Sequence, residues 1–152
     1  MVISAPSWSE ELKWKKRRDP KGLIGTPFLG QMIFPRMMKP RAPMWYDLSM
    51  ADTPHVQHFC TCTAAAFEHG ATFALPTMFQ NYLVGEQQPF EIPDQPAIAI
   101  WGTQDESHAD TDKSSSKTLA KSVQLVTLDH VGHFPELEDV PGFAALVDEF
   151  VA

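Results

Sequence analysis

The sequence predicts an α/β fold of about three parallel strands with flanking helices and a long, mostly helical insertion. Residues 97–152 alternate strand, loop, helix, strand, loop and helix, which is typical of parallel strands joined by right-handed crossovers. A strand-like run also opens the chain, and the segment between these regions is rich in proline and glycine. With 152 residues, the chain is one domain or part of one. We therefore expect a core strand at 1–6, a helical lid or cap inserted at 7–95, and a core segment at 96–152.

The first half of the chain combines one apolar run with several helical patterns. The run at 2–6 ends at a proline, as a buried strand does when it leaves a sheet. Apolar residues then recur at helical spacing, interrupted by prolines. The expected elements are a strand at 2–6, a helix at 7–18, short helical turns at 28–38, a helix at 54–69 with Thr53 as its cap, a helix at 72–84 broken at Pro76, and an extended linker at 86–96.

The second half has a clearer pattern. The run AIAIWG at 97–102 is continuously apolar and closes on a glycine, as a strand buried on both faces does. A second strand is expected at 123–128. The connecting elements are a polar loop at 103–112, a polar helix at 113–122 capped by Asp112, a loop at 129–139, and an amphipathic helix at 140–151.

Charge and composition exclude several classes of protein. The net charge of −7 does not favour nucleic acid as a partner. No stretch approaches the ~18–20 apolar residues of a membrane span. The basic cluster at 13–21 is either the exposed face of a helix or a contact for an anionic surface. Cys60 and Cys62 are too close for an unstrained disulfide, and the first residues lack a secretory signal pattern, so a cytoplasmic location is expected.

Asp105 and His133 are the candidate catalytic residues. Each follows one of two successive strands, and in parallel α/β sheets the loops at the carboxyl ends of strands build the active site. A carboxylate bonded to an imidazole fixes its tautomer and stabilises the imidazolium, as a general base requires. Taken singly, Asp105 could merely stabilise a turn and His133 could be a buried loop histidine. Two alternative acids, Asp110 and Asp112, stay open, and His108 and His130 are expected to face solvent.

Two motifs carry a resemblance to a known family. The segments PAIAIWGTQD at 96–105 and GHFPELE at 132–138, followed by the terminal helix, resemble the C-terminal part of the α/β-hydrolase superfamily. The resemblance implies that Asp105 is the acid and His133 the base of a catalytic triad. It also implies that 2–6 is the strand after the nucleophile, that 7–95 is a lid, and that neither a cofactor nor a metal takes part.

The family's nucleophile is missing from the sequence. No G-x-S-x-G motif occurs in the 152 residues, and Ser4, Ser7 and Ser9 do not lie in such an elbow. The resemblance therefore implies that the chain corresponds to the lid and last three strands of a larger hydrolase of ester or acyl bonds. It also implies that the chain is inactive as a hydrolase by itself. If the protein is active, we expect a small apolar or acyl substrate. We also expect an N-terminal half-protein, or a second copy of the chain, to pair along the exposed edge of the first strand. The alternative is a non-catalytic remnant or a subunit that pairs with another polypeptide.

Three weaker patterns remain. His55, His58, Cys60 and Cys62 offer zinc ligands, but their spacing suits residues of a lid helix better than a metal-binding module. Tyr46 and Tyr82 resemble the paired lid tyrosines of epoxide hydrolases, which leaves an enzyme of that kind as a weaker alternative. Methionine and aromatic residues gather at 28–50, where they either face an apolar substrate or pack the lid on the core.

Overall fold

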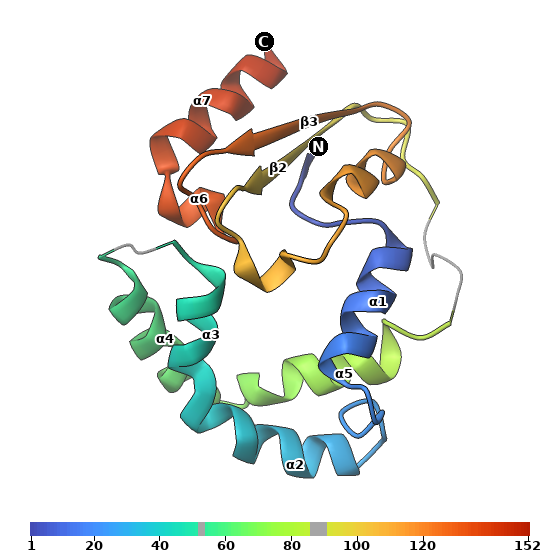
Figure 1. Ribbon diagram of the computed structural model, residues 1–152, viewed down its shortest axis with the longest axis vertical. Coiled ribbons are helices and arrows are strands. Elements are labelled where there is room, and N and C mark those ends of the chain that lie inside the picture. The colour runs from blue at the N-terminus through green and yellow to red at the C-terminus, as the bar shows by residue number, and fades with distance from the viewer. Residues whose placement is uncertain (52–53, 86–90) are drawn as a thin grey trace.

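A small parallel sheet lies at one end of the molecule and a group of helices at the other (Figure 1). The computed structural model describes residues 1–51, 54–85 and 91–152. The sheet has the order β1 (Val2–Ile3), β2 (Ala97–Gly102) and β3 (Val123–Leu128), with both pairs parallel. The predicted α/β class is therefore confirmed, and both long strands have the predicted bounds.

The three strands differ in burial because of their places in the sheet. All six residues of β2 are buried, as expected for a continuous apolar run between two neighbours. By contrast, β1 pairs with β2 on one side only, and Val2 is 44% exposed. The strand expected at 2–6 is therefore only the two-residue β1, and it lies at an edge of the sheet with unpaired backbone groups, as the expected open edge requires.

The helical insertion consists of the described residues between β1 and β2. In Figure 1, α1 leads away from the sheet to α2, α3, α4 and α5, at the opposite end of the molecule from α7. Ser7 caps α1 by accepting a hydrogen bond from the backbone of Glu10. The elements of the insertion are α1 (Trp8–Arg18), α2 (Leu29–Met38), η1 (Lys39–Arg41), α3 (Ala42–Ser49), α4 (Val56–Glu68), η2 (Ala71–Phe73) and α5 (Ala74–Asn81).

The prolines of the insertion disturb its helices less than the sequence predicts. The segment expected to form short turns is a regular helix, α2, although it contains Pro35. Its packing compensates, because Phe34 is buried and Gly30 lies so close to the carbonyl of Ile24 that a Cβ would overlap it. Pro76 does not break α5, because it lies in the first turn, where its missing N–H is not needed. The proposed cap Thr53 and part of the expected linker, 86–90, lie outside the described residues.

The elements after β2 are short until the last helix. They are η3 (Glu106–His108), η4 (Lys113–Thr118), α6 (Pro135–Glu138) and α7 (Val140–Val151). The polar helix expected at 113–122 is only the 3₁₀ turn η4, although Asp112 caps it as predicted. Serine hydroxyls compete for backbone hydrogen bonds, which favours turns over helices. The helix α7 has the predicted bounds.

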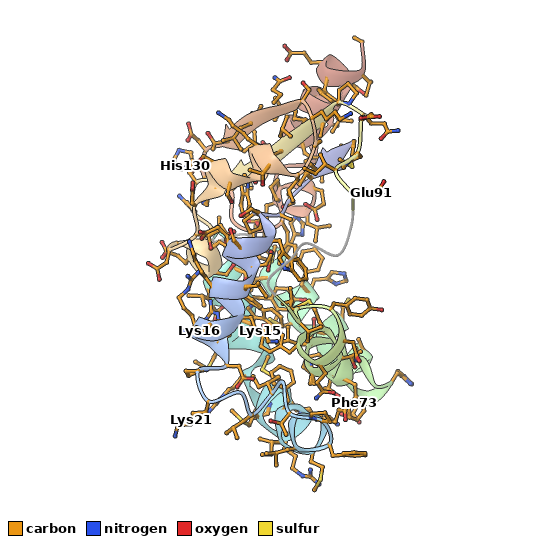
Figure 2. The ribbon with its side chains drawn as sticks, turned by 90° about the vertical axis from the view of Figure 1, so that its right-hand side faces the viewer. Lys15, Lys16, Lys21, Phe73, Glu91 and His130 are labelled. Atoms are coloured by element: carbon orange, nitrogen blue, oxygen red, sulfur yellow. The ribbon has the colours of Figure 1, made fainter. Side chains whose placement is uncertain are left out.

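The basic cluster at 13–21 is only partly an exposed helix face. Lys16 and Lys21 are exposed along α1 and just after it (Figure 2). Lys15 instead donates hydrogen bonds to the carbonyls of Phe79 and Leu83 at the end of α5, at 2.8 and 2.5 Å. These contacts, together with the packing of Trp14 on Phe79 and Leu83, hold α1 against α5. No helix in the described ranges has both the length and the apolar character needed to cross a membrane.

Candidate functional site

Two glycines allow the loops after β2 and β3 to meet. A Cβ on Gly102 would overlap the backbone of Val131 and Gly132, and a Cβ on Gly132 would overlap the backbone of Ser49 and Ala51. The N–H of His133 donates to the carbonyl of Ser49 at 2.6 Å. The glycines of the W-G and G-H motifs therefore serve close backbone contact.

The structure brings Asp105 and His133 into direct contact. Nδ1 of His133 lies 2.9 Å from Oδ2 of Asp105, whose residue is only 3% exposed. Oδ1 of Asp105 accepts hydrogen bonds from the hydroxyl of Ser107 at 2.5 Å and the N–H of His108 at 3.2 Å. Burial raises the pKa of Asp105, but the hydrogen bonds from His133 and Ser107 outweigh it, so the pKa lies below its usual value.

An ionised Asp105 determines the tautomer of His133. A carboxylate only accepts hydrogen bonds, so Nδ1 must carry the proton and donate it. Nε2 then presents a lone pair, and no group in the described part of the chain bonds to it. The imidazole is partly exposed, with 26% of its side chain accessible. This is the arrangement of a general base with an open nitrogen.

The alternatives for the acid do not contact His133. Asp110 is exposed, and Asp112 accepts hydrogen bonds from Ser114 at the start of η4. Asp105 also stabilises a turn, because its side chain caps η3. His130 is exposed, as predicted, beside Gln104.

His108 is buried, so the prediction that it faces solvent is wrong. Its ring is stacked between His133, at 5.0 Å and 9°, and Trp14, at 5.9 Å and 10°. Its Nδ1 lies 3.1 Å from the hydroxyl of Thr111. Burial lowers the pKa of His108 to about 4, helped by nearby positive charges and opposed by Asp105. A neutral imidazole therefore supports the ring of His133. Part of its burial comes from α1, whose Trp14 is far along the sequence from His108.

Glu138 is a second residue that sequence reasoning missed. Its Oε2 accepts hydrogen bonds from the backbone N–H groups of Ala51 and Gly132, at 2.7 and 3.0 Å, and its Oε1 accepts one from Phe134 at 3.0 Å. The carboxylate thus ties the His133 loop to the chain just after α3. Glu138 lies within the GHFPELE run, and that motif was the feature of the sequence that could have pointed to it.

The imidazole of His133 lines a cavity of about 390 Å³ beneath the helical insertion. Its polar lining includes Ser4, which follows β1, Glu11 of α1, and Ser107 and His108 of η3. Burial raises the pKa of Glu11, an effect that the neighbouring His133 opposes. The remaining lining is mostly apolar, and the predicted methionine and aromatic region contributes Phe34, Met38 and Trp45.

Neither metal binding nor a tyrosine pair fits this geometry well. Possible ligand atoms of Asp105, His108 and His133 lie within 4.8 Å of one another, but the two imidazoles are stacked face to face, which does not direct ring nitrogens at one ion. Within the described ranges, the side chains at 55–62 form no comparable group. Tyr46 bonds to the hydroxyl of Thr63 at 2.6 Å and Tyr82 is exposed, so neither is placed to act beside His133.

Six chains of solved structures are similar to this chain, and the two structures described next are among them. No family model and no curated protein matches the sequence. One structure, titled "Est816 as an N-Acyl homoserine lactone degrading enzyme", is 16% identical over 98% of this chain and 66% of its own, with a TM-score of 0.47. The other, 2-hydroxy-6-oxo-6-phenylhexa-2,4-dienoate hydrolase (BphD) from Rhodococcus sp. strain RHA1, is 17% identical over 100% of this chain and 52% of its own, with a TM-score of 0.46. The chain thus spans 66% and 52% of the lengths of these two structures. The support for a function comes instead from the contact of Asp105 with His133.

Proposed function

We propose that Asp105 and His133 are the acid and base of a hydrolase of ester or acyl bonds, in the manner of the α/β-hydrolase superfamily. One observation carries the proposal. A buried, ionised carboxylate holds Nδ1 of His133 at 2.9 Å, while Nε2 is unbonded within the described chain and the ring lines a cavity. This geometry is suited to accept a proton at Nε2 and to stabilise the imidazolium that results.

The attacking group is proposed to be a serine outside the 152 residues. Of the serines that line the cavity, Ser107 donates its hydroxyl to Asp105, and Ser4 makes no hydrogen bond to His133. A serine near Nε2 would lose its proton to His133 as it attacks the carbonyl carbon. His133 would return that proton to the leaving oxygen, and a water molecule would then repeat the sequence on the acyl-enzyme.

The open edge of β1 is the proposed place where the missing part joins. Beside it lies a second cavity of about 410 Å³, lined mostly by apolar residues that include Met1, Ile3, Pro6 and Trp8. A parallel strand added there would pair the free backbone groups of β1 and cover this surface. We propose a nucleophile-bearing N-terminal half-protein as the occupant, with self-association as the alternative. The same edge also suits the other candidate function, a non-catalytic subunit.

An esterase assay tests the proposal. The chain is purified alone and together with the product of an adjacent reading frame that encodes G-x-S-x-G, and each is given 4-nitrophenyl butyrate. We expect no turnover by the chain alone. In the complex, His133→Asn should lower kcat by about 10³- to 10⁴-fold. His130→Asn is the matched control, because His130 lies on the same loop but is exposed, and asparagine tolerates its positive φ.

Two results would contradict the proposal. Turnover by the chain alone that is lost in His133→Asn would show that no outside nucleophile is needed. Equal loss in both histidine variants, or in neither, would remove His133 from the reaction. A gene without any such neighbouring frame favours the non-catalytic subunit or remnant.

A further inference from the structure

The helix α2 carries apolar side chains on the side that faces solvent. Its buried side packs on the insertion through Gly30 and Phe34, but the opposite side is also apolar. Met32 is 60% exposed there, and the apolar residues beside it on the helix are exposed as well. A solvent-facing helix side is ordinarily polar, and a helix that is apolar all round is ordinarily covered. The α2 face consists of Phe28, just before the helix, and Leu29, Met32, Ile33 and Met37.

Hydrogen bonds hold Phe28 in its exposed position. The residue is 80% exposed, and its φ of 62° lies in the left-handed region, which is costly for a bulky side chain. Its N–H donates to Oε1 of Gln31 at 3.3 Å, and Gln31 donates to Gln80 at 2.8 Å. Gln80 in turn donates to the carbonyls of Ile24 and Thr26, both at 3.1 Å. An aromatic ring fixed in solvent in this way is available to a partner.

Basic side chains border the α2 face on both sides. On one side, Lys21 (Figure 2) lines a cavity together with Ile33. On the other side, Arg36 lines a cavity together with Met32. Residues 20–46 hold four basic side chains and neither aspartate nor glutamate, although the whole chain has a net charge of −7. The apolar face is therefore set in a locally positive surface.

The basic residues that border the α2 face differ in their contacts. Arg36 donates to the carbonyl of Met32 at 2.5 Å, which holds its guanidinium against the face. Lys39 lines the same cavity but pairs with Glu68 at 2.7 Å, so part of its charge is already neutralised. Arg36 is therefore the better placed of the two to meet an anion.

An anionic lipid surface fits both the apolar and the basic parts of this region. Apolar side chains can enter the boundary between headgroups and acyl chains while flanking lysine and arginine side chains meet anionic headgroups. A strand paired along β1 would lie at the sheet, at the other end of the molecule from α2 (Figure 1). A second copy packed face to face would set the basic borders of the two copies against one another.

We propose that the α2 face binds the surface of a membrane that contains anionic lipids, with Phe28 and Met32 at the acyl chains and Arg36 at the headgroups. The proposal goes beyond the proposed hydrolase function and uses neither member of the catalytic pair. The two claims can therefore fail separately.

Vesicles of two compositions test the proposal with the purified chain. One kind is phosphatidylcholine alone, and the other contains about 30% phosphatidylglycerol. In a sedimentation assay we expect at least about 10-fold stronger binding to the anionic vesicles, because each cation near such a surface strengthens binding by about 5-fold. Added salt should reduce this preference. Repulsion by the overall negative charge alone would give the opposite order, and His133→Asn should bind as the unsubstituted chain does.

Phe28→Asn should lower binding to the anionic vesicles by about 5- to 10-fold, and asparagine tolerates the positive φ at this position. Val140→Gln is the matched control, because Val140 is 57% exposed but begins α7, at the opposite end of the molecule from α2. Arg36→Gln should lower binding by about 5-fold. Lys117→Gln, which changes an exposed lysine of η4, should leave binding unchanged.

A spectroscopic measurement on the unsubstituted chain keeps the test valid if a variant fails to fold. The chain is added to bicelles of the same anionic lipids that carry a paramagnetic lipid. The methyl NMR signals of Met32 and Met37 should broaden most. Met1, which is 47% exposed at the sheet end of the molecule, should broaden less.

The proposal is overturned if the chain binds both kinds of vesicle equally, if it prefers phosphatidylcholine alone, or if it binds neither. It is equally overturned if Phe28→Asn folds and binds as before, if Val140→Gln loses as much binding, or if Met1 broadens as strongly as Met32. Self-association that Phe28→Asn abolishes, without binding to vesicles, would assign the α2 face to a second copy instead.

Discussion

The sheet end and the helical insertion bury their side chains very differently. Every residue of β2 is buried, and the loops after β2 and β3 touch through backbone atoms at Gly102 and Gly132. The insertion instead leaves large apolar side chains in solvent, among them Met44, which is 66% exposed. The difference separates two tasks. The tightly packed end fixes the geometry of Asp105 and His133, while the insertion provides most of the apolar walls of the cavity that His133 lines.

The largest loss of stability is expected at the packed end. Trp101 is fully buried in β2, and its Nε1–H donates to Ser116 Oγ at 3.0 Å. Trp101→Ala would remove this contact and leave a cavity, so we expect the free energy of unfolding to fall by about 3–5 kcal/mol. Urea unfolding measures it. A loss below about 1 kcal/mol would mean that the sheet end is not the rigid part of the molecule.

The burial of His108 predicts a pH dependence of stability. The pKa of His108 is about 4 in the folded chain, against an ordinary value of 6.5. Between these values the unfolded chain binds more protons, so stability is full above pH 6.5 and falls as the pH drops toward 4. The expected loss is about 3 kcal/mol. Glu11, whose pKa is raised, acts with the opposite sign.

Urea unfolding of His108→Phe between pH 4 and 6.5 isolates this contribution. The variant keeps a ring between Trp14 and His133 but cannot titrate, so the slope of stability against pH should shrink. His130→Asn, which changes an exposed histidine, should keep the original slope. Equal slopes in His108→Phe and the unsubstituted chain would contradict the buried, neutral state of His108.

A smaller loss is expected where the two regions are joined. Glu138→Gln replaces a carboxylate that accepts three backbone N–H bonds, from Ala51, Gly132 and Phe134. Hydrogen bonds to charged groups contribute about 1.5–3 kcal/mol, so we expect a decrease in unfolding free energy of this size. In the unsubstituted chain the amide of Gly132 should exchange its hydrogen slowly, and Glu138→Gln should make that exchange faster. Unchanged exchange would show that the His133 loop does not depend on Glu138.

The smallest effect is expected on the surface of the insertion. Met44→Ala should change the free energy of unfolding by no more than about 0.5 kcal/mol, because the side chain is mostly in solvent. A loss of several kcal/mol would show that this surface is covered in solution, and would weaken the contrast between the two regions.

The sequence predicts the elements whose pattern is set by local neighbours. The bounds of β2, β3 and α7 follow from the continuous apolar run of β2, the β-branched and apolar residues of β3 and the amphipathic spacing of α7. The contact between Asp105 and His133 was also predictable, because parallel strands bring their carboxyl ends to one edge of the sheet. These features can be predicted from the spacing of apolar residues, the length of each run and the direction of the strands.

The features that the sequence did not predict depend on distant contacts. The helix α2 persists through Pro35 because Phe34 and Gly30 pack against other parts of the insertion. His108 lies in a polar stretch, and its burial requires Trp14, which approaches from α1. The run at 2–6 resembles a buried strand, but only Val2 and Ile3 pair in the sheet and Val2 stays exposed, because burial depends on how many strands flank the run.

The most direct test of the central claim is the tautomer of His133, measured by NMR with ¹⁵N-labelled imidazole at neutral pH. If Asp105 holds Nδ1 as the structure indicates, the neutral ring carries its proton on Nδ1 and leaves Nε2 as an acceptor. Asp105→Asn should disturb this state, whereas Asp110→Asn, on the same loop, should not. A neutral ring protonated on Nε2, or a tautomer indifferent to Asp105→Asn, would contradict the account.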